Sequence, residues 1–305
     1  MFQKIKSFFK KSEDIVTVWH LLRQFYFKYF FTDERIIKKK FKKRLGRELN
    51  LDNPIKFNDK IQWLKLNWYD PLGVKCADKF KVRKYVKEKI GEEHINKLYG
   101  IYNSVNEINL NNLPKKFVLK GTHGSGFNII CKNKDKINWK IKKKEMKRWM
   151  KLNYYWRTRE WVYKDIKPRI ICEKYLEEPG LSEVKDYKIF CFNGEPKIIQ
   201  VDFNRFTHHK RNLYDLDWNF LNVKIEYPSD KNKKIKKPEK LNKMLKLSKK
   251  LSEGFSHVRV DFYYVKNKII FGEMTFFHGS GMEKIIPEEF EIKMGNWLDL
   301  PKNMI

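Results

Sequence analysis

Apolar residues recur at helical spacing through the first part of the chain. Over 33–49 the residues predicted to share one helix face are Ile36, Ile37, Phe41 and Leu45. A second helix is predicted over 57–70, with Asn58 or Asp59 near its N-cap. Residues 1 to about 65 therefore form a predicted N-terminal helical region.

The pattern then changes from helices to short strands. A helix predicted over 78–90 ends at Gly91, a natural stop. Two strand-like runs, 116–120 and 128–131, flank a glycine-rich loop, and another helix is predicted over 142–156. Strand, glycine loop and strand form one coherent unit.

Strands dominate the second half. The apolar, β-branched or aromatic runs are 168–176, 186–203, 257–265 and 268–277. Turn residues at 192–196 and 265–268 predict two antiparallel hairpins. Between the hairpins, 238–255 is an amphipathic helix that ends near Gly254, and its predicted core residues are Leu241, Met244, Leu245, Leu247 and Leu251. Because strands come in hairpins and helices come singly, α+β is favoured over a doubly wound parallel sheet.

Composition adds a large core and a strong positive charge. The 305 residues are 41% hydrophobic and 15% aromatic, which excludes a wholly disordered chain. The net charge of +30 predicts attraction to polyanions such as nucleic acid, anionic lipid, nucleotides or acidic glycans. Most of the excess is Lys, a pattern that AT-rich coding also produces, so both origins stay open.

The cysteines and the hydrophobic runs give expectations about the cellular location of the protein. Cys76, Cys131, Cys172 and Cys191 form no C-x-x-C pair, so we expect reduced core thiols of a cytoplasmic protein. We expect no signal peptide and, without a run of about 18 apolar residues, no transmembrane helix. The segment 19–31 is apolar and aromatic, which fits either a helix packed on the main domain or peripheral contact with a membrane interface.

A lysine and a glycine-rich loop suggest phosphate chemistry. Lys120 ends the run 116–120, and the loop behind it consists of Gly121, Thr122, His123, Gly124, Ser125 and Gly126. Glycines let backbone N–H groups approach phosphate oxygens, and a lysine supplies countercharge. The lysine precedes the glycines, so this is not the GxxxxGK[ST] loop. A hairpin turn with an exposed lysine remains the alternative.

Carboxylates interrupt the apolar strands of the second half. Asp261 and Glu273 lie in runs where a buried carboxylate is costly unless it is paired or bound to a metal. On adjacent antiparallel strands the two could converge on Mg²⁺. Arg259 shares the strand face of Asp261, so a buried salt bridge is the alternative.

A second acidic pair lies earlier in the chain. Glu173 follows the run IIC, and Asp186 shares a strand face with Lys188. A surface hairpin would explain these residues without any function.

Taken in order, these pieces resemble a known family. The chain carries VLK–GTHGSG, IICEKYLEE, DYKIFCFNGEP, VRVDFY and FGEMTFFHGSG, in the order of the ATP-grasp enzymes. ADKFKVRKYV, REWVYKDIKPRI and FTHHKRNLYDLDW are similar to the TupA-like branch, which is associated with teichuronopeptide and other capsular or O-antigen polysaccharide synthesis. The resemblance covers roughly 55–300 and implies an α+β ATP-grasp fold with an N-terminal helical segment.

The resemblance also implies a domain division. Residues 1–65 would be the N-terminal helical region and 66–305 the ATP-grasp region. Within the latter, about 78–180 would form a lid and hinge subdomain and about 181–305 a metal-binding subdomain.

By this resemblance, ATP is the cofactor, bound by residues of both halves. Lys79 and Lys120 would contact its phosphates under the mobile loop 121–126, and Asp186 would lie near the ribose. Lys188 would lie near a phosphate or the acyl phosphate. The adenine hinge would consist of Glu173, Lys174, Tyr175 and Leu176.

The resemblance places Mg²⁺ on Asp261 and Glu273, with Arg259 stabilising the transferred phosphoryl group. Many ATP-grasp enzymes have Asn two residues after the metal-binding Glu, whereas this chain has Thr275. Its hydroxyl could ligate Mg²⁺ or hold a water. The following His278, Gly279 and Ser280 would lie near the carboxylate pocket.

The implied reaction is an ATP-dependent ligation of a carboxylate to an amine through an acyl phosphate, with Lys120, Lys188 and Arg259 as catalytic residues. The partners would be an acidic sugar or glycan acceptor and an amine or amino acid. Basic residues expected to bind the acceptor are Arg205, His208, His209, Lys210 and Arg211. The location would be cytoplasmic, with peripheral membrane contact through the N-terminal helices left open.

Other functions stay open from the sequence alone. An ATP-grasp glycan kinase would phosphorylate its acceptor and stop there. A glycosyltransferase, a label often given to this branch, lacks support because DLD at 215–217 is a weak D-x-D match. A non-enzymatic polyanion-binding protein would rely on the net charge, although no motif specific for nucleic acid is present.

Overall fold

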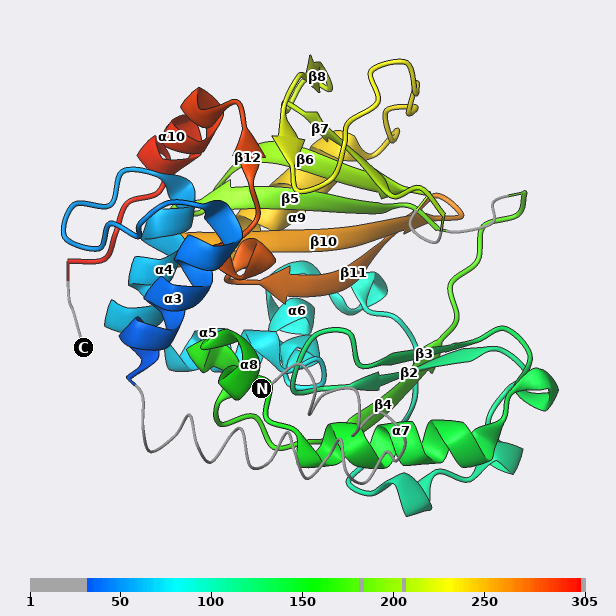
Figure 1. Cartoon of the computed structure of the whole chain (residues 1–305). Coiled ribbons are helices and arrows are strands. Elements are labelled where there is room, and N and C mark those ends of the chain that lie inside the picture. Colours follow the sequence, from blue (N-terminus) through cyan, green and yellow to red (C-terminus); the bar gives the residue numbers. More distant parts are fainter. Residues whose placement is uncertain (1–31, 181–183, 205–206, 303–305) are drawn as a thin grey trace.

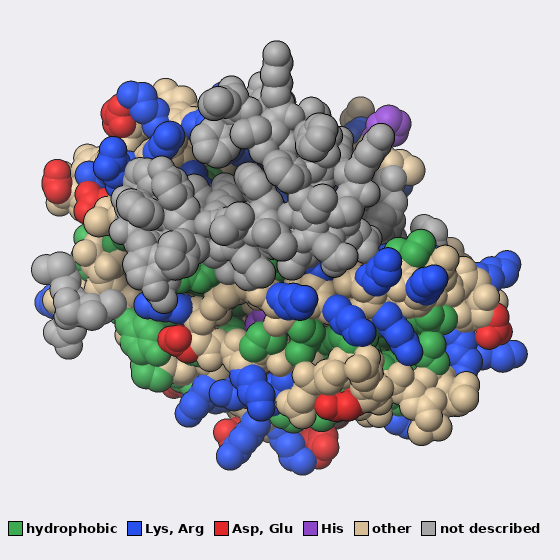
Figure 2. Space-filling model, turned by 60° about the horizontal axis from the view of Figure 1, so that its bottom comes forward, with side chains coloured by type: hydrophobic (Ala, Val, Ile, Leu, Met, Phe, Trp, Pro, Cys, Tyr) green, Lys and Arg blue, Asp and Glu red, His purple; other side chains and the backbone are tan. Residues whose placement is uncertain are grey.

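A computed structural model describes residues 32–180, 184–204 and 207–302. The predicted segment 19–31 and Arg205 lie outside these residues. Two antiparallel sheets dominate the described part, the larger above the smaller in Figure 1, with helices around both. Lys and Arg side chains predominate over Asp and Glu on the face seen in Figure 2.

The smaller sheet has four strands in the order β1-β4-β2-β3. Its strands are β1 (Leu98–Tyr102), β2 (Phe117–Gly121), β3 (Asn128–Cys131) and β4 (Ile170–Lys174). Helix α7 (Trp139–Lys151) runs along it (Figure 1), and its Met146 and Trp149 join Phe117 and Leu119 in a common core. The predicted strand, glycine loop and strand are therefore the β2–β3 hairpin.

The larger sheet has six strands in the order β11-β10-β5-β6-β7-β8. Its strands are β5 (Asp186–Phe192), β6 (Glu195–Phe203), β7 (Lys210–Tyr214), β8 (Phe220–Leu221), β10 (His257–Val265) and β11 (Lys268–Thr275). Two-residue turns close the β5–β6 and β10–β11 hairpins. Positive φ at Asn193, Gly194, Lys266 and Asn267 gives these turns the twist that hairpins need. Both predicted hairpins are confirmed.

Helices pack on the larger sheet and beside it. They are α3 (Asp33–Leu45), α4 (Phe57–Asn67), α5 (Pro71–Ala77), α6 (Val82–Ile90), α8 (Tyr155–Thr158), α9 (Leu241–Ser252) and α10 (Glu288–Asn296). A small ladder joins β9 (Lys224–Ile225) to β12 (Ile285–Ile286). As predicted, α9 buries Leu241, Met244, Leu247 and Leu251, while Leu245 is half-buried.

Helix α4 begins at Phe57, as predicted, and Asn58 and Asp59 lie in its first turn, next to the N-cap Lys56, which makes no side-chain cap. Both side chains are buried because Asn58 bonds Glu291 and Asp59 accepts two hydrogen bonds from Arg47. Their polar groups fasten α4 to its neighbours instead of capping it.

Helix α6 differs from the prediction, because it begins at Val82 and not at Asp78. The Asp78 carboxylate accepts hydrogen bonds from the backbone N–H groups of Phe80 (2.8 Å) and Lys81 (3.2 Å), which forms a turn before the helix. Its other oxygen is 2.7 Å from Arg169. This turn sets the position of the intervening Lys79.

The buried apolar residues form separate cores for the two sheets. The larger core joins the six-stranded sheet to α4, α5, α6, α9 and α10, and the smaller joins the four-stranded sheet to α7. All four cysteines are buried and free, as predicted. In the described part of the chain no helix is long and apolar enough to cross a membrane.

Candidate active site

Lys120 and Glu173 form an ion pair on neighbouring strands of the smaller sheet. Lys120 Nζ lies 2.8 Å from Glu173 Oε2, and Arg83 of α6 reaches the other carboxylate oxygen at 2.8 Å. Burial opposes the charge of Lys120, but the Glu173 carboxylate outweighs burial and raises the lysine's pKa. Lys120 is therefore a fixed cation and not the exposed lysine of a turn.

Lys79 lies against the glycine-rich loop. Its backbone N–H donates to Thr122 O at 3.3 Å, and its Nζ donates to Gly124 O at 2.5 Å. Burial lowers the pKa of Lys79, and the Lys120 charge adds to this effect against the opposing charge of Glu273. A half-buried ammonium that donates to a backbone carbonyl instead of a carboxylate is suited to bind an anion.

Most of the glycine-rich loop is anchored. Thr122 and His123 are buried, and His123 Nε2 lies 2.8 Å from Trp149 O. A Cβ on Gly124 would come within 3.0 Å of Phe127 and Tyr154. The exposed part is the tip, Ser125 and Gly126, whereas Gly121 is buried at the end of β2. Mobility of the loop stays a prediction, and its natural focus is this tip.

Arg259 joins the three predicted metal ligands on the larger sheet. It donates to both oxygens of Asp261 at 2.7 Å, and its Nη2 lies 3.3 Å from Glu273 Oε1 and 3.1 Å from Thr275 Oγ1. The strand register sets Asp261 opposite Glu273 and Arg259 opposite Thr275. Asp261, Glu273 and Thr275 therefore converge on one point.

The two carboxyl groups differ in their pKa. Burial raises the pKa of Asp261 to about 6, against the opposing charges of Arg259 and Lys188. Burial also opposes ionisation of Glu273, but the cations Lys79 and Arg259 outweigh it and hold its pKa below the ordinary value. Lys79 belongs to the turn beside the glycine-rich loop, so the cations there and the carboxylates of the larger sheet act on one another.

Lys188 occupies the centre of an acidic cluster. Its Nζ contacts Asp186 and lies 3.5 Å from Asp202 Oδ2 and 3.9 Å from Asp261 Oδ2. Asp186, Lys188 and Asp202 are all buried. Asp202 is not among the predicted site residues, although it interrupts the apolar strand β6 just as Asp261 interrupts β10.

A second network holds the loop that follows β11. Arg259 Nη1 donates to His278 Nδ1 at 2.8 Å, so the neutral imidazole carries its proton on Nε2, 3.0 Å from Glu283 Oε2. Arg211 reaches Glu283 at 2.8 Å and Asp202 at 2.7 Å. Burial opposes ionisation of Glu283, but His278 and Arg211 together lower its pKa to about 2.

The predicted acceptor residues are not gathered at one described site. Arg211 is buried within the network just described, and His209 lies 3.4 Å from Asp202 Oδ1. Lys210 pairs with Asp230 at 2.7 Å, and His208 is exposed. Arg211 therefore holds the carboxylates of Asp202 and Glu283 in place. Binding of an acceptor by this segment stays a prediction.

A model of the TupA-like ATP-grasp family matches residues 59–299. The chain belongs to this family. No curated protein matches the chain. The family assignment confirms the α+β ATP-grasp fold that the ordered motifs predicted.

Solved structures of ligases are similar at low identity. D-alanine–D-alanine ligase from Bacillus anthracis, complexed with ATP, is 15% identical with a TM-score of 0.39, over 66% of this chain and 54% of that one. The Helicobacter pylori D-alanine–D-alanine ligase is 16% identical with a TM-score of 0.41, over 81% and 67%. The ADP complex of N5-carboxyaminoimidazole ribonucleotide synthetase is 12% identical with a TM-score of 0.42, over 71% and 50%. The TupA-like chain thus spans about half the length of the first of these ligases.

The segment predicted as the adenine hinge begins at the end of β4 in the smaller sheet. Lys174 ends β4 with an exposed side chain, and Tyr175 and Leu176 follow without regular structure, both half-buried. Asn96 and Lys97 bond the backbone of Lys174 at 2.9 Å each, which anchors the start of the segment. An adenine contact here stays a prediction, and Glu173 already pairs with Lys120 and Arg83.

The carboxylates of β10 and β11 suit a magnesium ion. No three His, Cys, Asp or Glu side chains gather into a metal-binding group within residues 32–180, 184–204 and 207–302. Mg²⁺ needs less, because it commonly binds through one or two carboxylates and completes its shell with phosphate oxygens and waters. Asp261 and Glu273 already face one cation, Arg259, so their oxygens fit this role, and the Thr275 hydroxyl lies beside them.

Proposed function

We propose that this chain is a Mg²⁺- and ATP-dependent ligase that joins a carboxylate of an acidic sugar to an amine or amino acid, in the synthesis of a surface polysaccharide. Family membership supports nucleotide chemistry. The observation that carries the proposal is the placement of Lys79 and Lys120 on one side and of Asp261 and Glu273 on the other, coupled through their charges.

The proposed reaction has two steps. A carboxylate oxygen of the acceptor attacks the γ-phosphorus of ATP, the bond from that phosphorus to the β–γ bridging oxygen breaks, and ADP leaves. The amine nitrogen then attacks the acyl carbon, the bond to the phosphate oxygen breaks, and phosphate leaves while the nitrogen loses a proton. Bound Mg²⁺ would neutralise phosphate charge during the transfer.

The residues of this chain would act mainly through charge and position. Lys79 and Lys120 would hold the phosphates, and Arg259 and Lys188 would offset the negative charge of the transferred group. The tip Ser125–Gly126 would cover the phosphates and keep water from the acyl phosphate. Because ATP is the phosphoryl donor, the proposed reaction takes place in the cytoplasm.

The first test is calorimetric titration of ATP with and without Mg²⁺, on the wild type, on Glu273→Gln and on the control Glu289→Gln. Glu289 is exposed on α10. We expect Mg²⁺-dependent binding that weakens about tenfold or more in Glu273→Gln alone, since one charge-assisted ligand is lost. No nucleotide binding to the wild type would contradict the proposal.

The second test follows the products. Acidic sugars and amines are supplied separately and together, and ADP, AMP and phosphate are measured. The proposed ligase releases ADP and phosphate when both substrates are present. Release of AMP would sink the ligase mechanism, and a stable phosphorylated sugar formed without amine would identify a glycan kinase.

A further inference from the structure

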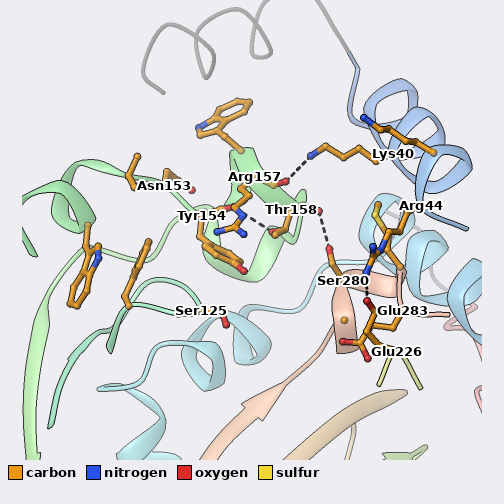
Figure 3. A pocket seen from close by; sticks show the side chains of 18 of the residues that line it. Lys40, Arg44, Ser125, Asn153, Tyr154, Arg157, Thr158, Glu226, Ser280 and Glu283 are labelled. Carbon is orange, nitrogen blue, oxygen red and sulfur yellow. Dashed lines mark hydrogen bonds and ion pairs between the residues drawn. The ribbon is translucent and has the colours of Figure 1, made fainter. Parts of the chain in front are cut away.

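A cavity of about 1000 Å³ lies beside the glycine-rich loop and the loop after β11. Helices α3, α7 and α8 form its outer walls, and η7 (His278–Gly281) contributes to its inner wall (Figure 3). At that inner side it reaches Ser125 and Gly126 from one direction and Ser280 and Glu283 from the other. This volume is at the upper end of the range for small-molecule sites.

The uncompensated charge of the cavity is positive. Five Lys or Arg residues and three Glu residues line it. Each glutamate already has a cation, because Glu145 pairs with Lys142, Glu226 with Arg44 and Glu283 with Arg211. In contrast, three of the lining cations make no ion pair with any acid in the described part of the chain, and these are Lys43, Arg148 and Arg157. The cavity can therefore accept an anionic ligand.

The remaining lining favours a ring that carries hydroxyl groups. Tyr154 and Trp156 are half-buried and offer aromatic surface, on which the C–H face of a pyranose ring can pack. The polar side chains Asn153, Thr158 and Ser280 also line the wall, and each makes hydrogen bonds within the protein as well. Figure 3 shows Tyr154 and Thr158 on the α8 side and Ser280 next to Thr158, whose backbone oxygen accepts a hydrogen bond from Ser280 Oγ.

Hydrogen bonds hold the inner wall in place, and a short stretch of chain connects it to the network around Arg259. Lys65 of α4 donates to Ser280 O at 2.6 Å and to Ser280 Oγ at 2.7 Å, and Gln62 donates to the same carbonyl at 2.8 Å. Ser280 is held at φ 58°, two residues from His278, the acceptor for Arg259. A ligand against Ser280 thus lies beside the network that supports the proposed metal site.

We propose that this cavity binds the acceptor, an acidic sugar whose carboxylates contact Arg148 and Arg157 and whose ring packs on Trp156. The inference rests on the proposed ligase function and gives its acceptor site a location. It assigns the acceptor to α7, α8 and η7 instead of the segment 205–211, where Arg211 is committed to Asp202 and Glu283.

The test measures binding of tetragalacturonic acid by calorimetry at physiological salt, with neutral maltotetraose as the sugar control. The cavity variant is Arg148→Gln/Arg157→Gln. The matched control is Lys246→Gln/Lys250→Gln, which removes the same charge from exposed positions on α9. Trp156→Ala tests the ring contact, and Mg²⁺-ATP affinity and the melting temperature are measured for every variant.

We expect the cavity variant to bind tetragalacturonic acid at least tenfold more weakly, with the control within twofold of wild type and ATP affinity unchanged. Trp156→Ala should weaken the binding of tetragalacturonic acid without changing the salt dependence of that binding. Equal weakening in both charge variants would overturn the inference, because the net charge alone would then explain binding. An eight-residue oligothymidylate that binds as tightly and depends on the same arginines would also overturn it.

The outcomes of these measurements distinguish the proposed acceptor cavity from the proposed ligase function. A wild-type protein that binds Mg²⁺-ATP but neither acidic sugar nor maltotetraose refutes the acceptor cavity and leaves the nucleotide site standing. A wild-type protein that binds tetragalacturonic acid through Arg148 and Arg157 but no ATP refutes the ligase and keeps the cavity as a glycan site.

Discussion

The guanidinium of Arg259 grips the carboxylate of Asp261 with two hydrogen bonds of 2.7 Å each, and both side chains are buried. The residues are two apart on β10, so the strand alternation places both side chains on one face. Burial opposes the charge of each, and the Asp261 carboxylate more than offsets this for Arg259, whose pKa is raised. A buried pair of this geometry is costly to break from one side only.

Removing Arg259 should therefore destabilise the protein strongly. We expect Arg259→Gln to lower the free energy of unfolding by about 3–5 kcal/mol, because the charge of Asp261 is left buried without its main partner. Urea unfolding at pH 7.5 measures the effect. The double variant Arg259→Gln/Asp261→Asn should lie closer to wild type than Arg259→Gln does, and a double variant that is less stable than the single one would refute this reasoning.

Glu283 should give a pH-dependent contribution to stability. Its pKa falls from 4.5 to about 2 in the folded protein, because His278 and Arg211 outweigh the effect of burial. A carboxyl group with a lowered pKa stabilises the fold above its unfolded pKa and loses that contribution as the pH drops toward the folded value. Glu283→Gln should thus cost about 3 kcal/mol at pH 6 and progressively less between pH 4.5 and 2.

Unfolding of wild type and Glu283→Gln across pH 2.5 to 7 tests this. Glu289→Gln is the control, since that side chain is exposed on α10. A cost that stays constant over the whole pH range would mean that Glu283 acts through packing and not through its charge.

Lys79 should matter for nucleotide binding, whereas a neighbouring lysine should not. Lys79 is held by the Asp78 turn and contacts Gly124 O, while Lys81 is exposed two residues later. We expect Lys79→Met to weaken Mg²⁺-ATP binding about tenfold or more, as befits one charge-assisted phosphate contact. Lys81→Met should stay within twofold of wild type in the same titration. Equal losses would point to general attraction by the basic chain.

Gly295 should resist replacement although it lies in a helix. Ala is normally better than Gly inside a helix by about 1 kcal/mol. In α10, however, a Cβ on Gly295 would lie 1.9 Å from Ile55 O, a backbone atom of the segment before α4. Gly295→Ala should therefore destabilise by about 2 kcal/mol or more, the cost of a forced backbone shift. Thermal unfolding against Glu289→Ala checks it, and an unchanged or higher melting temperature would show that α10 can move away.

The strands and hairpins followed from the sequence because their signals are local. The turns Asn193–Gly194 and Lys266–Asn267 are short and rich in residues that tolerate positive φ, and the strands around them alternate as expected. The shared faces of Asp186 with Lys188 and of Arg259 with Asp261 followed from the same period of two. The start of α6 was missed because Asp78 makes a turn through its side chain, which a periodicity argument does not detect.

The supporting residues of the candidate site were harder to predict. Glu283 and Arg83 each act through a partner far away in sequence, so nothing in their own neighbourhood marks them. Asp202 does carry a local signal, because it interrupts the apolar strand β6, and the prediction overlooked it. For Arg211, the basic and aromatic neighbours in sequence suggested an exposed binding surface. In the fold its side chain is buried by tertiary contacts, including the pair with Asp202. The cavity beside α8 depends on the packing of five separate segments, which sequence pattern alone does not give.

The separate hydrophobic cores of the two sheets have a mechanical consequence. Besides aromatic contacts such as Phe127 with Tyr154, the charges of Lys79, Lys120 and Glu273 connect the two sheets at the site. A nucleotide bound by cations on one side and by metal-bound carboxylates on the other would link the two sheets reversibly. The protein would then unfold in two stages when empty and as one cooperative unit when loaded.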